Sequence, residues 1–303
     1  MKILITGVHG FVGSNLVKAL SQEHTIYGLD IASPEKEGVV KTYSWADLDA
    51  GQVPEVDCII HLAGKAHDTK NQTEAESYFK ANRDLTIKIF DYFSDHPDIK
   101  KFVFFSTAKA AADRVDGVLT EDVIPAPAGP YGESKIAAER YILSSMKNRP
   151  GQFAGRGVFI FRPCMIHGPG NKGNLNLLYE VVRKGIPWPL GAFDNRRTFT
   201  SADNMCFAVN GVLTKDVASG IYNMGDDEAL STNELIEIIC SCLGKKAHIW
   251  RLPKGLMTCV AKIGGWLDLP LNPERLRKLT EDYVSSNAKI KAALGIDKRP
   301  VRA

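Results

Sequence analysis

The amino-acid sequence predicts an α/β protein built on a doubly wound parallel sheet, with a smaller lobe in its C-terminal half. Apolar segments of strand length alternate with helical patterns up to about residue 165, which is typical of a parallel sheet covered by helices on both faces. Beyond that point the alternation breaks, except for a segment near 220–224 that has the pattern of a last sheet strand. We therefore predict a sheet domain of residues 1–165, joined by a returning strand at about 200–225, and a lobe of residues 166–199 and 226–303.

A glycine-rich turn joins the first predicted strand to the first helix. Ile3–Ile5 is an apolar run too short for a helix, and it leads into Gly7, Gly10 and Gly13 and then into a helical pattern that reaches Leu20. Glycines let the backbone pass close to a pyrophosphate, and the free N–H groups at a helix start point toward its negative charge. The spacing is G-x-x-G-x-x-G and not the standard G-x-G-x-x-G, and such turns also use glycine for geometry alone. A second feature is therefore needed to identify a phosphate site.

A carboxylate at the end of the next strand supplies that feature. The strand Thr25–Asp30 ends at about the offset expected of a group that holds the 2′-hydroxyl of an adenosine ribose. A phosphate on that ribose would meet Asp30 with like charge, and no arginine follows directly, so we predict NAD, with NADP as the alternative. Residues 1–165 are thus predicted to form a Rossmann-type dinucleotide-binding domain.

Three longer strands and two helices complete this domain. The strands are Val56–Gly64, Phe102–Thr107 and Val158–Pro163, and the helices span about 73–93 and 131–146. Small residues end the first of these strands, which allows a cofactor to lie across the strand ends.

A shorter strand is also expected near Lys41–Trp45, and Asp47 and Leu48 follow it. A carboxylate with an apolar neighbour at this place can flank an adenine ring, and a surface turn fits the same residues equally well.

The C-terminal part of the chain predicts loops and separate helices. Helices are expected at Leu177–Lys184, from Asp203 onward, and after a capping box formed by Ser231 and Glu234. The apolar segment Leu256–Leu269 is too short to span a bilayer and contains charged residues, so we expect a packed helix. We expect the lobe to lie over the C-terminal edge of the sheet and to close a cleft there.

Composition limits the partners and the compartment. The 303 residues carry a net charge of +3 with both signs mixed along the chain, so no nucleic-acid surface is predicted. The sequence starts with a strand and shows no signal peptide, and no membrane span is predicted. Among six scattered cysteines only Cys240 and Cys242 are close, within a helical run and without further ligands, so no metal site is predicted. Reduced thiols and a cytoplasmic location follow as expectations.

Tyr131 and Lys135 stand four residues apart at the start of a predicted helix, and therefore on one face. A phenol with an ordinary pKa of about 10 is a poor base at neutral pH, but a neighbouring ammonium and an oxidised nicotinamide favour its anion. The same phenol can donate its proton when hydride travels the other way. Such a pair also occurs by chance, but here it follows a strand ending in Ser106 and Thr107, whose hydroxyl can hold the reacting oxygen. The combination predicts an active site.

These motifs together resemble the extended short-chain dehydrogenase/reductase family, in particular its nucleotide-sugar epimerases, dehydratases and ketoreductases. The resemblance runs from Lys2 to about Gly295 and rests on the glycine turn, Asp30, His61–Gly64, Asn82, Ser106, Thr107, Tyr131, Lys135, Arg162 and Pro163. The segments Ser106–Lys109, Arg162–Gly170 and Gly185–Arg197 are most similar to polysaccharide-cluster enzymes usually called UDP-glucose 4-epimerase. Some of those enzymes reduce a UDP-linked 4-keto-6-deoxy-N-acetylhexosamine.

The resemblance implies a catalytic triad of Thr107, Tyr131 and Lys135. Tyr131 would be the acid or base, Lys135 would lower its pKa and bind the nicotinamide ribose, and Thr107 would orient the sugar oxygen. The resemblance also implies that NAD is held by residues of the glycine turn, the strand ends and the triad, namely Gly7, Gly10, Phe11, Val12, Gly13, Asp30, Ile31, Asp47, Leu48, Leu62, Ala63, Gly64, Tyr131, Lys135 and Pro163.

For the substrate, the resemblance implies that Asn174, Arg197 and Asp203 lie near the nucleotide diphosphate. An arginine suits a diphosphate because its planar fork satisfies two oxygens at once. Arg196 is the alternative to Arg197 for this role. The predicted substrate contacts are completed by His67 and Lys109.

Some positions depart from the family pattern or have a structural interpretation. The dehydratase branch places acidic residues directly after the catalytic threonine, where this chain has Ala108 and Lys109, so dehydration lacks its acid and base. His61 is expected to be a packed residue at a strand end, and His167 is expected to form part of a pocket wall.

Three functions remain open on the sequence. The first is an NAD-dependent 4-epimerase acting on a UDP-hexose or UDP-N-acetylhexosamine, and the second is an NAD(P)H-dependent 4-reductase of a UDP-4-keto-6-deoxy sugar. The third, a dinucleotide-sensing regulator, is disfavoured because a sensor has no use for Tyr131 and Lys135. Relatives often dimerise through the helices that flank strands four and five, so a homodimer is expected.

Overall fold

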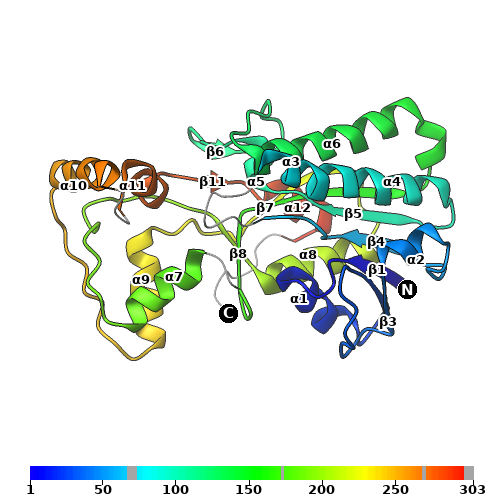
Figure 1. Cartoon of the computed structure of the whole chain (residues 1–303), viewed down its shortest axis with the longest axis horizontal. Coiled ribbons are helices and arrows are strands. Elements are labelled where there is room, and N and C mark those ends of the chain that lie inside the picture. The colour runs from blue at the N-terminus through cyan, green and yellow to red at the C-terminus, as the bar shows by residue number, and fades with distance from the viewer. Residues whose placement is uncertain (67–73, 172–173, 268–270, 297–303) are drawn as a thin grey trace.

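Seven parallel strands form the central sheet of the protein, which we describe from a computed structural model over residues 1–66, 74–171, 174–267 and 271–296. The strand order is β10-β7-β5-β4-β1-β2-β3, so the chain starts in the middle of the sheet and winds outward in both directions (Figure 1). Every neighbouring pair of these strands is parallel. The predicted doubly wound sheet is confirmed. Its strands are β1 (Lys2–Thr6), β2 (Thr25–Leu29), β3 (Lys41–Tyr43), β4 (Cys58–His61), β5 (Lys101–Phe105), β7 (Gly157–Pro163) and β10 (Gly220–Met224).

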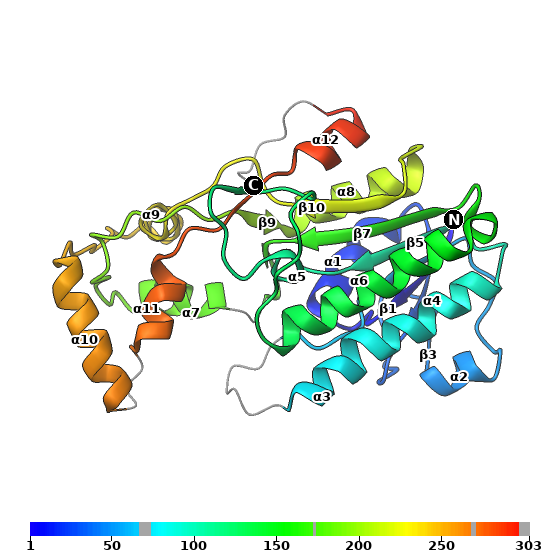
Figure 2. The same ribbon diagram turned by 90° about the horizontal axis from the view of Figure 1, so that it is seen from above.

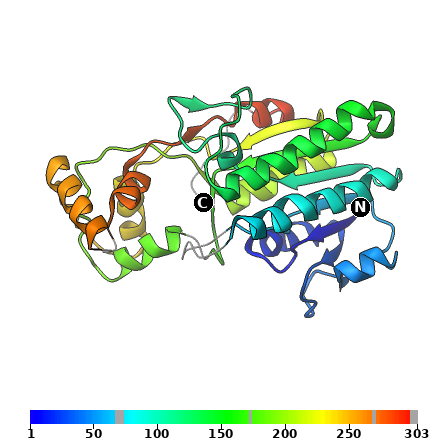
Figure 3. The same ribbon diagram turned by 45° about the horizontal axis from the view of Figure 1, so that its top comes forward.

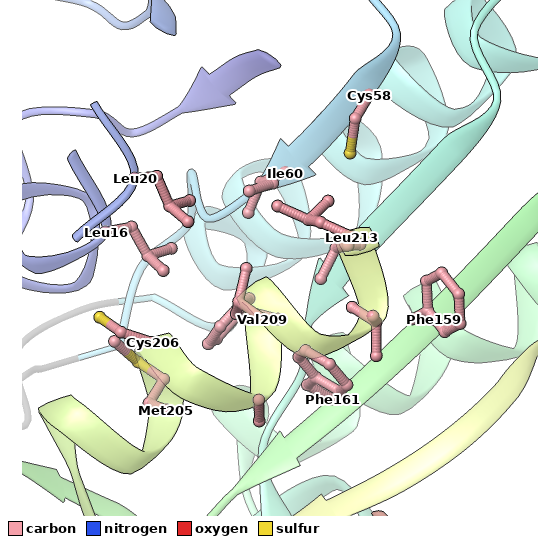
Figure 4. Packing of buried hydrophobic residues seen from close by; sticks show 14 of the residues in the cluster. Leu16, Leu20, Cys58, Ile60, Phe159, Phe161, Met205, Cys206, Val209 and Leu213 are labelled. Carbon is pink, nitrogen blue, oxygen red and sulfur yellow. The ribbon is translucent and has the colours of Figure 1, made fainter. Parts of the chain in front are cut away.

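Helices cover both faces of the sheet, which is why its central strands are continuous apolar runs. On one face the helices are α1 (Phe11–Leu20), α8 (Ala202–Thr214) and α12 (Ala288–Leu294). Figure 4 shows Leu16 and Val209 from two of these helices meeting Ile60 and Phe161 of the sheet. The other face is covered by α2 (Trp45–Asp49), α4 (Leu85–Asp95) and α6 (Pro130–Asn148).

The helix expected at about 73–93 changes its geometry in the middle. It begins as α3 (Ala75–Tyr78), continues as the π-helical segment η1 (Phe79–Asp84) and goes on as α4. Asn82 lies within η1 and is fully buried. A π-helical turn accommodates an extra residue and often occurs at functional sites, and the apolar pattern of the sequence does not indicate it.

A smaller lobe lies beyond the C-terminal ends of the strands (Figures 2 and 3). Its helices are α7 (Asn174–Arg183), α9 (Thr232–Cys242), α10 (Lys254–Trp266) and α11 (Pro273–Thr280). The predicted capping box opens α9, since Ser231 Oγ accepts from Glu234 N at 3.0 Å and the Glu234 carboxylate accepts from Ser231 N at 2.7 Å. Small apolar clusters hold the lobe together.

The chain crosses between the sheet and the lobe more than once. Three short strands lie on these connections, namely β8 (Met165–His167), β9 (Phe199–Ser201) and β11 (Val284–Ser285). Within the sheet domain, α5 (Ala108–Ala111) and β6 (Val118–Leu119) lie between β5 and α6, and η2 (Pro150–Phe153) joins α6 to β7. Strand β8 pairs with β9, and β6 pairs with β11. Helix α12 lies in the range assigned to the lobe, but its Ile290 and Leu294 belong to the core of the sheet. In the described ranges of the chain, no helix is both long and apolar enough to cross a bilayer.

Candidate active site

The glycine turn brings the start of α1 to the C-terminal end of β1. Gly7 has a φ of 69°, and a Cβ atom at this residue would lie 2.9 Å from the backbone nitrogen of Ala63, so only glycine fits. The N-cap residue of α1 is Gly10, and no side chain caps the helix. The N–H groups of Phe11–Gly13 therefore have no acceptor within the helix. They are available to an anion together with the positive end of the helix dipole, which fits a dinucleotide pyrophosphate.

Asp30 lies at the end of β2, beside the glycine turn. Its carboxylate accepts hydrogen bonds from the backbone nitrogens of His9 at 3.1 Å and Ile31 at 2.8 Å, which fix its position. The Ile31 side chain is 91% exposed. Lys36, a cation that the sequence did not single out, donates to Ser14 Oγ at 2.7 Å. Burial lowers the pKa of Lys36, and the nearby Asp30 raises it by less. Asp30 is thus placed for a ribose hydroxyl, with one lysine close by.

Asp47 and Leu48 have structural roles in α2. The Asp47 carboxylate completes a capping box with Ser44, accepting from its backbone nitrogen at 2.7 Å. Leu48 is buried in the apolar cluster that also contains Leu29 and Ile59. The expected strand ends at Tyr43 and not at Trp45, because the capping box starts a helix there. An adenine contact of Asp47 and Leu48 remains a prediction.

Strand β4 ends in a turn that Thr6 holds in place. Thr6 Oγ1 accepts from the backbone nitrogens of Leu62 at 3.1 Å and Ala63 at 3.0 Å, and it lies 2.7 Å from His61 Nδ1. His61 is fully buried, and burial together with Lys135 lowers its pKa well below the ordinary value. Its ring is therefore neutral and packed, as expected.

Asn82 closes the same turn from the side of η1. Its Oδ1 accepts from Lys65 N at 2.8 Å, and its Nδ2 donates to Lys65 O and to Ser134 Oγ, both at 3.0 Å. A Cβ atom on Gly64 would lie 2.6 Å from Asn82 Oδ1 and 3.4 Å from Lys135 Nζ. The turn, the π-helical segment and α6 thus meet closely, and Gly64 is the residue that permits it.

Thr107 and Tyr131 come together from two elements that are distant in sequence. Thr107 follows β5 and caps α5, and Tyr131 is the second residue of α6 after Pro130. Thr107 and Tyr131 are neighbours, and the Thr107 side chain favours the phenolate of Tyr131. The Tyr131 ring packs edge-on against Tyr78, with ring centroids 6.3 Å apart. Burial raises the pKa of Tyr131, Thr107 acts in the opposite direction, and Tyr78 adds a smaller raising effect.

Lys135 lies one helical turn after Tyr131 and is buried. Its Nζ donates to Phe105 O at 2.8 Å. Burial lowers the pKa of Lys135 to about 8, against a raising effect of Glu139. We expected this ammonium to lower the pKa of Tyr131, but the raising effect of burial is larger, and the contact that lowers it comes from Thr107.

A buried ion pair that the sequence did not predict joins α6, the helix of Tyr131 and Lys135, to strand β7. Glu139 and Arg162 are 0% and 1% exposed, and Arg162 Nε donates to Glu139 Oε1 at 3.0 Å. The Ser106 hydroxyl also donates to Glu139 Oε1. The available signal was the spacing, because Glu139 stands four residues after Lys135 and shares its helix face.

The two candidate arginines point in different directions. Arg196 is exposed, and its Nη1 donates to Ala229 O at 3.0 Å and lies 3.9 Å from Glu234. Arg197 is half-buried, and burial lowers its pKa while Glu281 raises it. Of the two, Arg197 is the inner side chain, and its Nη1 donates to Lys278 O at 2.8 Å.

Lys109 is held by neighbours next to the triad. Its Nζ donates to Asp113 O at 2.8 Å and Asp113 Oδ1 at 3.1 Å, and it lies 4.6 Å from the centre of the Tyr283 ring. The Tyr283 hydroxyl donates to Ala112 O at 2.8 Å. Lys109 can therefore reach a substrate only by sharing or leaving these contacts.

The remaining predicted residues differ in how the structure places them. Asp203 is exposed in the first turn of α8, and Pro163 is buried at the end of β7. Asn174 is the first residue of α7, with its side chain outside the described part of the structure. His67 lies outside the described residues.

His167 is partly buried, and its place in a pocket wall remains a prediction. Its Nε2 lies 3.3 Å from Asp226 Oδ2, and Asp226 is buried and accepts from Ser201 N and from Asn204 Nδ2.

All six cysteines are free, and Cys240 is buried whereas Cys242 is exposed. In the described part of the chain, no group of three or more His, Cys, Asp or Glu residues is placed to hold a metal ion.

Comparison with known proteins agrees with this geometry. Residues 3–225 match the NAD dependent epimerase/dehydratase family. The chain belongs to this family. As a member, the protein is an enzyme of the NAD-dependent epimerase/dehydratase type, as the sequence predicted, on a confirmed Rossmann-type fold.

Relatives in this family act on several sugar nucleotides. The UDP-glucose 4-epimerase of Vibrio cholerae is 30% identical over 270 residues, which cover 83% of this chain and 78% of the relative. The GDP-6-deoxy-D-mannose reductase of Pseudomonas aeruginosa is 25% identical and covers 78% of this chain and 79% of its own. The solved UDP-N-acetylglucosamine 4-epimerase of Bacillus cereus superposes with a TM-score of 0.76 at 21% identity, covering 98% of this chain and 94% of that chain. The UDP-glucuronic acid 4-epimerase of Bacillus cereus, solved with NAD, has a TM-score of 0.74 at 20% identity, with coverages of 99% and 94%.

Proposed function

We propose that this protein is an NAD-dependent 4-epimerase of a UDP-hexose or UDP-N-acetylhexosamine. The observation that carries the proposal is that Thr107 and Tyr131 are neighbours, one helical turn from the buried Lys135. These residues lie at the C-terminal edge of the sheet that also presents the start of α1 and the turn at Gly64. Such an edge is the usual place for a dinucleotide in this kind of sheet.

Three side chains of the protein assist the oxidation and the reduction at C4 of the sugar. When bound, NAD supplies hydride uptake and hydride return. Tyr131 takes the proton of the C4 hydroxyl as the sugar is oxidised and gives it back when the sugar is reduced. Thr107 holds the same oxygen and the phenol in line. Lys135, with its pKa near 8, holds its ammonium close to Gly64, where a ribose hydroxyl can accept from it.

The remaining predicted residues bind the two nucleotides. The N–H groups of Phe11–Gly13 would hold the pyrophosphate of the dinucleotide, and Asp30 would hold its adenosine ribose. Arg197, as the inner arginine, would bind the UDP diphosphate, because a guanidinium fork pairs with two phosphate oxygens. Asn174, Asp203, Lys109 and His67 remain predicted substrate contacts.

A 4-reductase of a UDP-4-keto-6-deoxy-N-acetylhexosamine is the second candidate. It is supported by the reductases among the relatives and by the same triad, because a phenol that accepts a proton from an alcohol can donate one to a ketone. Dehydration is not proposed, since Ala108 is buried and Lys109 is engaged with Asp113 at the positions where acidic residues would be required.

One experiment separates the two candidates. The purified protein is analysed for bound dinucleotide and then incubated with UDP-glucose, with UDP-N-acetylglucosamine and with a UDP-linked 4-keto-6-deoxy sugar. Appearance of the C4 epimer by NMR without added cofactor supports the epimerase. Loss of NADH or NADPH absorbance in proportion to ketone consumed supports the reductase, and neither activity on any of these sugars contradicts both proposals.

We also propose a cytoplasmic homodimer that forms through α4 and α6, the helices flanking the strands β4 and β5. These two helices lie side by side on one face of the sheet, and Leu143 of α6 is partly exposed there. Light scattering on the purified protein gives its mass in solution, and Leu143→Glu is expected to weaken the dimer.

A further inference from the structure

Helix α10 presents an apolar surface to the outside of the lobe. Its inner residues Met257, Ala261 and Gly264 are buried. The opposite side consists of exposed residues, which we call the outer face of α10. They are Leu256 (51% exposed), Cys259, Val260 (42%), Ile263 (56%), Trp266 (86%) and Leu267 (55%).

The outer face is continuous and lies at the tip of the lobe. At 3.6 residues per turn its six residues fall within an arc of about 120° around the helix axis. Figures 1 and 2 show α10 at the end of the molecule that is farthest from α2 and β3. Single exposed apolar residues are normal, but a contiguous apolar patch marks an interaction surface. A packed helix was expected at Leu256–Leu269, and in α10 only one side is packed.

The segment 244–267, which leads into α10 and contains it, carries basic charge only, and the first acidic residue after it is Asp268. Residues 244–267 include no Asp or Glu, and their basic residues Lys245, Lys246, Arg251, Lys254 and Lys262 are all exposed. Lys262 lies on α10 itself, beside the apolar arc. Trp250, just before the helix, is 54% exposed, so two tryptophans accompany the basic residues. Exposed leucine, isoleucine and tryptophan next to lysine form the composition of helices that lie in a lipid interface.

We propose that the outer face of α10 docks on the surface of an anionic lipid bilayer. The helix would lie in the plane of the interface, with its apolar residues among the acyl chains and its basic neighbours on the phosphate groups. This contact is peripheral and requires no spanning helix. It does not depend on the sugar or on the reaction proposed above.

A second copy of the chain is a less suitable occupant. In a two-fold contact the same surface meets itself, so the lysines and Arg251 around one outer face would approach those around the other. Like charges at such a contact cost free energy. An anionic membrane instead supplies the opposite charge beside Lys262, the basic residue that adjoins the apolar arc.

The test is co-sedimentation of the full chain with vesicles. Wild type is expected to bind vesicles of phosphatidylcholine mixed with phosphatidylglycerol, to bind pure phosphatidylcholine less, and to lose binding as salt is raised. The double variant Ile263→Glu with Leu267→Glu is expected to bind the anionic vesicles at least about tenfold less. Val40→Glu is the matched control, because Val40 is also exposed (65%) but precedes β3 on the sheet domain. This control is expected to bind like wild type.

Three results would overturn the proposal. One is the absence of wild-type binding to anionic vesicles, and another is equal binding by the double variant. The third is that wild type is a dimer and the double variant is a monomer, while both bind vesicles equally. A second copy would then be the occupant of the outer face. Both substituted side chains are exposed, so thermal unfolding and turnover of a water-soluble UDP-sugar are expected to match wild type. If the wild type turns over no UDP-sugar, this result counts against the proposed function, but the vesicle result is unaffected.

Discussion

Glu139 and Arg162 form an ion pair that is shielded from solvent on both sides. Arg162 Nε lies 3.0 Å and 3.2 Å from the two carboxylate oxygens, and Nη2 donates to Oε2 at 2.5 Å. Glu139 belongs to the helix that carries Tyr131 and Lys135, and its other hydrogen-bond donor, Ser106, is the neighbour of Thr107. The ion pair therefore fixes β5, β7 and α6 relative to one another, and with them the three predicted catalytic side chains.

Replacing Glu139 by alanine is expected to destabilise the fold by about 3–5 kcal/mol, because Arg162 would keep a buried charge without a partner. Urea unfolding measures this loss. The matched control is Glu180→Ala, which removes an exposed carboxylate 2.7 Å from Arg183 and should leave the urea midpoint nearly unchanged. Similar costs for the two variants would show that the buried pair does not hold the site together.

Tyr131→Phe is expected to lower turnover by about 10²- to 10⁴-fold, because it removes the group that exchanges the proton with the sugar. Dinucleotide affinity, measured by calorimetry, should stay within a few-fold of wild type. Tyr141→Phe is the control on the same helix, since its hydroxyl donates to Asp91 away from the triad. Turnover of Tyr131→Phe close to that of this control would remove the phenol from the mechanism.

Lys135→Met is expected to change how stability depends on pH. The pKa of Lys135 is about 8 in the folded protein and has its ordinary value of 10.5 in the unfolded chain. Below pH 8 the buried ammonium therefore costs the wild type free energy, at most about 3 kcal/mol. Between pH 8 and 10.5 the unfolded chain binds more protons than the folded protein, so wild-type stability rises with pH.

The variant lacks this dependence, so its stability relative to wild type should be greatest below pH 8 and should decline as the pH rises toward 10.5. Denaturant unfolding at a series of pH values tests the trend. Lys147→Met, at an exposed position near the end of the same helix, should show a constant difference from wild type. A constant difference for Lys135→Met as well would contradict the lowered pKa.

Gly64→Ala is expected to weaken dinucleotide binding by at least about tenfold, because the added methyl would lie 2.6 Å from Asn82 Oδ1 and displace the turn. Gly151→Ala is the control, since a Cβ atom at Gly151 meets nothing within 4 Å. Affinity is measured by calorimetry with NAD. Unchanged affinity in Gly64→Ala would show that this turn does not border the cofactor.

The sequence was most informative where local chemistry decides the structure. The strands, the glycine turn and the capping box at Ser231 each follow from a few adjacent residues, and the structure has them where they were predicted. A helix around Asn82 was predicted, but its π-helical turn was not. Strand β3 ends at Tyr43 and not at the expected Trp45, because Ser44 caps a helix that starts there.

The side-chain pairings of the site were harder to predict than its elements. Tyr131 and Lys135 are neighbours on one helix, so their spacing was sufficient. The ion pair of Glu139 with Arg162 joins a helix to a strand, and its partners are chosen by tertiary packing. Burial also set the pKa of Tyr131 higher than the motif suggested, because desolvation depends on the folded surroundings and not on spacing.

The position of α12 has a consequence for the order in which the protein folds during synthesis. Residues 288–294 leave the ribosome only after the whole lobe has been made, yet Ile290 and Leu294 fill the same core as α1. Part of the apolar surface of the nascent sheet therefore stays exposed while the lobe is translated. During that interval chaperones can bind this surface.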